Sequence, residues 1–228
     1  LLKQDGVQVN RASNSGASPL YVAAERGHTK VVRILLSKSD IDINKAKDNG
    51  CTALYQASDN NHIEVVRLLL SKSDIDINKA RDDGATSLYV ASQESHVEVV
   101  RLLLSKSDID INKAEEDGVT ALIIASQEGR VEVVRLLLSK SDIDINKALD
   151  DGRTALYTAS YEGHVEVVRL LLSQSDIDMN KAVDDGATAL YVASCYGQVE
   201  VVRLLVSKSE IDINKARDNG TTALYMAS

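Results

Sequence analysis

The chain has 228 residues, of which 44% are hydrophobic and 26% charged, as is ordinary for a soluble globular protein. Its net charge of −8 argues against nucleic-acid binding, which needs a basic stripe, and no apolar run approaches the ~20 residues that span a bilayer. Cys51 and Cys195 are isolated, which argues against a disulfide framework and favours a reducing, cytoplasmic location. Trp and Phe are missing from the sequence, so burial must rest on Leu, Ile, Val and Ala.

Glycine recurs every 34 residues, and the surrounding sequence repeats with it, at Gly16, Gly50, Gly84, Gly118, Gly152, Gly186 and Gly220. This period gives six full repeats, at 13–46, 47–80, 81–114, 115–148, 149–182 and 183–216. Residues 1–12 form the tail of a preceding repeat and residues 217–228 a truncated one, as in a piece cut from a longer array. Such a period predicts an all-α repeat solenoid over residues 1–228, in which short helices become stable by stacking.

The fifth repeat shows the first, inner helix that each repeat is expected to contain. Thr154 can cap a helix over residues 155–160, because its side-chain oxygen can accept a hydrogen bond from an amide of the first turn. Gly163 should end this helix in the left-handed conformation.

A second, outer helix follows over residues 164–173, where Val and Leu cover more than half of the circumference. Glu166 and Arg169 stand three residues apart on it and are expected to pair. Residues 176–180 then alternate polar and apolar side chains, which predicts an extended, strand-like finger.

The residues around the glycines resemble the ankyrin repeat. Gly-x-Thr-x-Leu opens the inner helix and Gly-His opens the outer one, as in residues 152–156 and 163–164, and the resemblance covers essentially the whole chain. It implies helix-turn-helix units with extended finger loops. The chain departs from the family pattern in having Thr-Ala-Leu-Tyr in place of Thr-Pro-Leu-His and one residue more than the usual ~33, which suggests a distinct subfamily. Tyr fills the His slot in every repeat but one, where Ile123 stands, and its hydroxyl could bridge adjacent repeats.

Histidines and asparagines recur at fixed repeat positions. A metal shared between repeats is excluded by the spacing of the histidines, so we interpret them as helix caps: His28, His62, His96 and His164. We expect the asparagines at the finger turn to bond their local backbone, although the resemblance implies that this residue can also be hydroxylated: Asn44, Asn78, Asn112, Asn146, Asn180 and Asn214.

No catalytic residue, metal site or cofactor is predicted. The spacing of Asp40, Asp42 and Asn44 resembles the start of a calcium loop, but Lys45 and Cys51 stand where that loop needs Gly and a bidentate acid. Cys195 has no His or acid at a fitting repeat position to activate its thiol.

The resemblance implies a non-catalytic protein–protein interaction scaffold, which binds through its finger tips and the exposed end of the inner helix on the concave side. In the fifth and sixth repeats these positions carry the Tyr and Arg that are enriched at interface hot spots, with apolar neighbours. We therefore predict a partner-binding patch made by Leu149, Arg153, Tyr161, Glu162, Val183, Cys195 and Tyr196. Two alternatives stay open: that Leu149 and Val183 pack between fingers, and that the variable positions reflect drift.

Acidic pairs just before the glycines should form a row along the finger tips: Asp82, Asp83, Glu116, Asp117, Asp150, Asp151, Asp184 and Asp185. The row predicts either a basic partner protein, steered in by charge, or a repelling edge that keeps the array monomeric. A second function is also open, a regulatory or spacer array attached to a channel or enzyme domain outside this segment. The likeness of the repeats also suits a consensus-designed or recently duplicated array.

Overall fold

The computed structural model describes residues 8–226, which form two compact units divided between Glu116 and Asp117. The N-terminal unit contains α1 (Pro19–Glu25), α2 (Thr29–Leu35), α3 (Ala53–Asp59), α4 (Ile63–Leu70), α5 (Ser87–Gln93) and α6 (Val97–Leu104). The C-terminal unit contains α7 (Ala121–Gln127), α8 (Val131–Leu138), α9 (Ala155–Glu162), α10 (Val165–Leu171), α11 (Ala189–Cys195), α12 (Val199–Val206) and α13 (Ala223–Met226).

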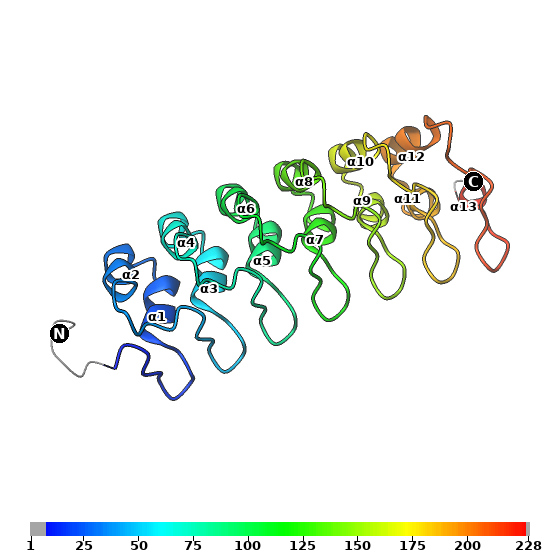
Figure 1. The fold of residues 1–228 in the computed structure, drawn as a ribbon. Coiled ribbons are helices and arrows are strands. Elements are labelled where there is room, and N and C mark those ends of the chain that lie inside the picture. The colour runs from blue at the N-terminus through cyan, green and yellow to red at the C-terminus, as the bar shows by residue number, and fades with distance from the viewer. Residues whose placement is uncertain (1–7, 227–228) are drawn as a thin grey trace. The chain divides into compact units, whose positions relative to one another are not determined.

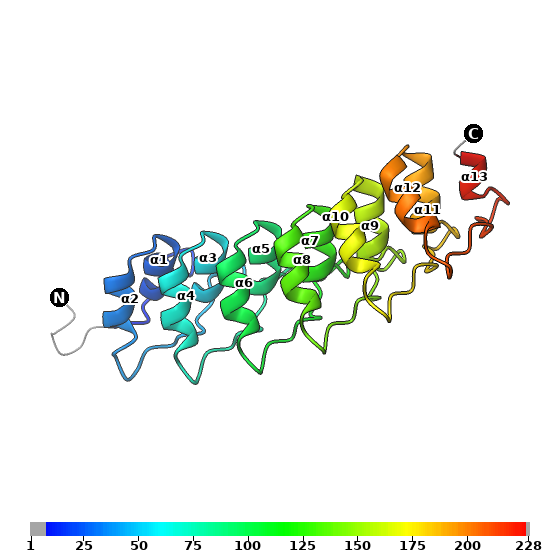
Figure 2. The same cartoon turned by 90° about the horizontal axis from the view of Figure 1, so that it is seen from above.

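Within each unit the helices form two rows. The inner helices α1, α3 and α5 pack one after another in the N-terminal unit, as do α7, α9, α11 and α13 in the C-terminal unit. Each outer helix packs against the inner helix of its own repeat, and the finger loops project from the side of the inner helices (Figure 1; Figure 2). This arrangement confirms the predicted all-α repeat solenoid.

The inner helices begin where the capping residues predict. Thr154 has extended backbone, and its Oγ1 accepts a hydrogen bond of 3.2 Å from the amide of Tyr157. The same bond from the third residue on forms at the side chains of Ser18, Thr52, Thr86, Thr120 and Thr188. Because the cap satisfies an amide that the helix itself leaves unpaired, a helix of seven or eight residues has a fixed start.

The outer helices bury the apolar stripe that holds each repeat together. In α10, Val167, Val168 and Leu171 are fully buried. The helix spans Val165–Leu171, slightly less than predicted. The predicted pair forms on its exposed face, with Arg169 Nε 3.5 Å from Glu166 Oε1, where solvent leaves an ion pair little effect on stability.

The inner helices end in a left-handed residue, as predicted for Gly163, which has φ +78°. Asn61 and Ser95 take the same conformation without being glycine, with φ +55° and +61°. Left-handed backbone brings Cβ close to the following carbonyl, and only Asn and Asp among polar residues relieve this strain locally. Ser95 is therefore the strained member of the series.

Replacing Ser95 with glycine should stabilise the protein by about 0.5–1 kcal/mol, because glycine adopts this conformation without steric cost. Asn61→Gly is the matched control and should gain less, since asparagine already tolerates the left-handed region. Urea unfolding of both variants measures the difference. A loss of stability in Ser95→Gly would contradict the strain argument.

The predicted strand over residues 176–180 is wrong. This segment ends in a turn in which Asp178 Oδ1 accepts from the amide of Asn180 at 3.0 Å. Single antiparallel bridges close three fingers of the C-terminal unit: Ala148 with Thr154, Ala182 with Thr188 and Ala216 with Thr222. The Asp-Ile-Asp alternation reflects one buried position, such as Met179, rather than a strand.

The expected local role of the asparagines is also wrong, because their side chains bond the next repeat. Asn146 Nδ2 donates to the carbonyl of Asp176 at 2.8 Å, and Asn146 Oδ1 accepts from the amide of Asp178 at 2.8 Å. The same two bonds join Asn44 to Asp74 and Asp76 in the N-terminal unit. The local backbone bond at this turn comes instead from the preceding aspartate.

The histidines are the N-cap residues of the outer helices, but their side chains make no capping hydrogen bond. The His164 ring instead reaches the preceding repeat, where its Nε2 lies 2.8 Å from the carbonyl of Gln127, the last residue of α7. His62 and His96 bond the carbonyls of Glu25 and Asp59 in the same way. The predicted cap position is therefore confirmed, but the ring has another role: it bonds a carbonyl at the C-terminal end of the neighbouring inner helix.

Candidate functional site

The described part of the chain, residues 8–226, contains no helix long and apolar enough to cross a membrane. The same residues contain no group of three or more His, Cys, Asp or Glu side chains placed to hold a metal ion. The residues predicted to bind a partner lie on the surface formed by the fingers and the inner helices.

In three fingers the second acid of the acidic pair closes the turn. Asp151 Oδ1 accepts from the amide of Arg153 at 3.1 Å, and the turn is completed by a 2.9 Å bond from the Gly152 amide to the Leu149 carbonyl. Asp83 and Asp185 accept from the amides two residues on in the same way, at 3.1 and 3.0 Å. These carboxylates therefore stabilise the finger turns, a role that the acidic row in the sequence did not reveal.

Arginines pair with several of these turn carboxylates. The Arg81 guanidinium bonds the Asp83 carboxylate, with Nε 2.9 Å away, and this bond holds the pKa of Asp83 below its usual value. At Asp185 the backbone amide of Ala187, together with Arg217, lowers the pKa. The first acid of each pair is exposed: Asp82, Glu116, Asp150 and Asp184. The free acidic charge at the finger tips is thus smaller than the sequence implies.

Neighbouring fingers within a unit are joined through their backbones. The Asp82 amide donates to the Asn49 carbonyl at 3.1 Å, and the Asp184 amide donates to the Asp151 carbonyl at 3.2 Å. These bonds hold neighbouring finger tips beside each other within each unit.

Three of the residues that stand three positions before a finger glycine are cations that stack on a tyrosine of the preceding repeat. Arg81 lies over the ring of Tyr55, with 5.5 Å from Cζ to the ring centroid, a distance at which a cation is attracted to the ring face. Lys47 lies over Tyr21 at 5.6 Å and Arg217 over Tyr191 at 5.1 Å.

Leu149 occupies this stacking position in the fifth repeat. Its side chain is only 9% exposed, and the Tyr slot of the preceding repeat holds Ile123, which is 1% exposed. The cation and the aromatic ring are thus replaced together by two aliphatic side chains. This matched change favours the alternative in which Leu149 packs between fingers. The sequence contained a signal for this packing, because residues 123 and 149, which are 26 positions apart, both depart from the repeat pattern.

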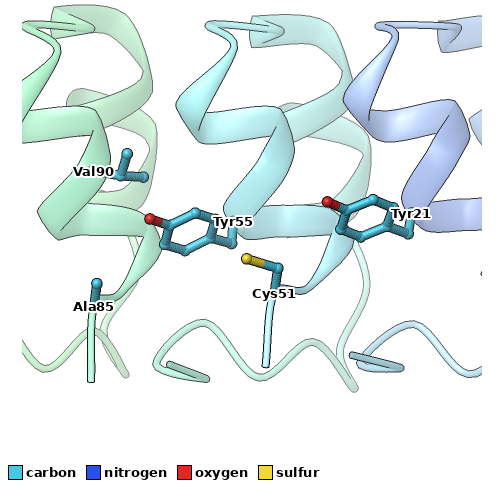
Figure 3. Close-up of a cluster of buried hydrophobic side chains, with 5 residues drawn as sticks. All are labelled: Tyr21, Cys51, Tyr55, Ala85 and Val90. Atoms are coloured by element: carbon cyan, nitrogen blue, oxygen red, sulfur yellow. The ribbon is translucent and has the colours of Figure 1, made fainter. Parts of the chain in front are cut away.

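Two residues that follow a finger glycine in the N-terminal unit, Cys51 and Ala85, are buried beside the tyrosines. Tyr21, Cys51, Tyr55, Ala85 and Val90 form one apolar cluster in the N-terminal unit (Figure 3). Tyr21 Oη donates to Gln56 Oε1 at 2.9 Å in the next repeat, which confirms the predicted bridge, and burial raises the pKa of Tyr21 to about 12. Burial also raises the pKa of the Cys51 thiol, which disfavours the nucleophilic thiolate.

In the C-terminal unit the predicted residues Tyr161 and Tyr196 meet on the surface. Their ring centroids are 4.5 Å apart in an edge-to-face arrangement, and the side chains are 39% and 56% exposed. A hydrogen bond with Tyr161 raises the pKa of the Tyr196 hydroxyl. Cys195 beside them is exposed, and Val183 is partly buried at the stacking position.

Beside this aromatic pair lies a pocket of about 300 Å³, lined by Gln127, Arg153, Tyr157, Thr158, Tyr161 and Glu162. Arg153, Tyr161 and Glu162 were predicted, whereas Gln127, Tyr157 and Thr158 were not. Tyr157 and Tyr161 are four residues apart on α9 and so share one face of the helix. This spacing was the sequence signal that Tyr157 belongs to the same surface as Tyr161. Arg153 Nε donates to Asp151 Oδ2 at 2.7 Å at the rim.

A family model for ankyrin repeats (three copies) matches residues 1–81, 42–115, 74–148, 144–217 and 175–228. Among solved structures, the chain is similar to the crystal structure of EF0377, an ankyrin repeat protein, with 28% identity and a TM-score of 0.79 over 87% of this chain and 100% of that one. No curated protein matches the chain. Because the overlapping matches extend from end to end, the chain belongs to the ankyrin repeat family, whose repeats generally mediate protein–protein interaction.

Proposed function

We propose that the chain is a non-catalytic scaffold that binds a partner protein through the finger and inner-helix surface of its C-terminal unit. The observation that carries this proposal is the exposed edge-to-face pair Tyr161 and Tyr196. Two large side chains that contact each other while keeping 39% and 56% exposure leave apolar area in water that a partner can cover.

The surroundings of the pair support an interface. Tyr and Arg dominate hot spots, and Arg153 lies at the rim of the pocket that Tyr161 lines. The exposed acids Asp150, Asp184 and Glu162 provide the polar rim that interfaces have around their apolar centre. These carboxylates favour a basic partner, whose association rate would fall as salt screens the attraction.

Tyr161→Ala and Tyr196→Ala should each weaken binding of the partner by roughly 1–3 kcal/mol, the range for an aromatic hot spot. The free energy of unfolding should change little, because both rings are largely exposed. Calorimetry with a partner captured on the immobilised chain measures the first effect, and urea unfolding measures the second.

The matched control is Gln93→Ala, because Gln93 holds the position equivalent to Tyr161 on α5 in the N-terminal unit. This variant should bind like the parent chain. If both tyrosine variants bind normally while substitutions at Asp59 and Gln93 abolish binding, the site lies in the N-terminal unit and the proposal is wrong.

A further inference from the structure

The chain shows how it recognises a guanidinium group at one of its own tyrosines. Arg217 lies over the ring of Tyr191, with Cζ 5.1 Å from the centroid. Its NH1 donates to Tyr191 Oη at 3.3 Å, and its NH2 bonds the carboxylate of Asp185 in the finger that precedes the tyrosine. A ring face, a hydroxyl and a carboxylate thus contact this guanidinium at the same time.

One repeat earlier the same position is occupied by a side chain that cannot do this. Val183 stands 26 residues after Tyr157, as Arg217 stands 26 residues after Tyr191. The backbone lies in the same place in both repeats: the Val183 Cα is 2.8 Å from a Cβ built on Gly152, and the Arg217 Cα is 3.0 Å from one built on Gly186. At this position an aliphatic side chain therefore stands where the next repeat has the arginine that covers Tyr191.

Tyr157 lines the pocket of about 300 Å³ described above. This volume is at the lower end of the range for small-molecule sites, which suits one side chain. Tyr161 and Glu162 line the same pocket and add a second ring and a carboxylate. The two cations near Tyr157 are already paired with carboxylates, Arg153 with Asp151 and Arg217 with Asp185.

We propose that this pocket binds the side chain of an arginine on the partner protein, which stacks on Tyr157 and pairs with Glu162. The proposal rests on the proposed interaction function and specifies its chemistry. Arginine fits better than lysine, because a planar guanidinium stacks on an aromatic face and bonds a carboxylate with two donors at once. The partner thus supplies the group that the chain itself supplies at Tyr191.

The test uses N-acetyl-arginine amide as the probe, titrated into the whole chain with the tyrosine rings labelled for NMR. We expect the ring signals of Tyr157 and Tyr161 to move in a saturable way, while the signals of Tyr191 stay in place because Arg217 already covers that ring. The citrulline amide, which has the same shape without the charge, should leave all of these signals unmoved. The lysine amide should shift Tyr157 only weakly.

The decisive variant is Val183→Arg, which supplies the missing cation from the chain itself and should abolish the shifts caused by the probe. Val183→Leu is its matched control, and the probe should still bind it. Equal shifts with citrulline, shifts at Tyr191 as large as those at Tyr157, or unchanged probe binding in Val183→Arg would overturn the proposal. The titration needs no partner protein, so such a result leaves the proposed interaction surface standing, whereas normal partner binding by the Tyr161 and Tyr196 variants removes that surface from the C-terminal unit.

Discussion

Gly152→Ala should destabilise the protein by about 2–5 kcal/mol, as measured by urea unfolding. Gly152 has φ +88°, and an L-residue in this region costs roughly 1–2 kcal/mol. In addition, a Cβ on Gly152 would lie 2.8 Å from the Val183 Cα and 3.2 Å from the Ala182 carbonyl oxygen, both of which belong to the backbone of the next finger. Rotating a side chain cannot relieve that clash, so the neighbouring finger must shift, which adds about 1–3 kcal/mol.

Two variants separate the strain from the clash. Gly220 has nearly the same φ, +81°, but a Cβ there meets no atom within 4 Å among the described residues, so Gly220→Ala should show the strain alone. Gly152→Asn relieves part of the left-handed strain but keeps the Cβ, and it should retain most of the loss. Equal losses in Gly152→Ala and Gly220→Ala would show that close packing of the fingers contributes nothing.

Asn146→Ala should cost about 2–3 kcal/mol. The side chain both donates to the Asp176 carbonyl and accepts from the Asp178 amide, each at 2.8 Å, so its removal breaks two bonds between repeats. A hydrogen bond contributes about 0.5–1.5 kcal/mol, and an unsatisfied group costs more where water reaches it poorly. Asn146 is partly buried, which limits replacement of these bonds by water.

Asn214→Ala is the matched control, because Asn214 stands in the same Asp-Ile-Asn-Lys motif while its side chain is exposed. Its removal should change the unfolding free energy by less than about 0.5 kcal/mol, as for other surface substitutions. Asn146→Asp keeps the acceptor for the Asp178 amide but sets a carboxylate against the Asp176 carbonyl, and it should be at least as destabilising as Asn146→Ala. If Asn146→Ala and Asn214→Ala cost the same, the bonds between repeats do not contribute to stability.

The sequence by itself determined the features that depend on residues a few positions apart. The cap at Thr154 and the left-handed Gly163 follow from local backbone geometry, since the partner of each group lies in the same helical turn. The 34-residue period determined the two-row stacking, because helices this short are stable only when they pack on copies of themselves.

Only the tertiary structure decided what each recurring polar residue bonds across repeats. From the sequence, Asn146 and His164 were interpreted as local turn and cap residues. The hydrogen-bond partners of their side chains lie 30 to 37 residues away in the neighbouring repeat. Leu149 was predicted as part of a partner site, and only the structure shows that its side chain is 9% exposed. The physical reason is the offset between stacked repeats: it brings together groups about one period apart, and the pattern within a single repeat contains no information about that offset.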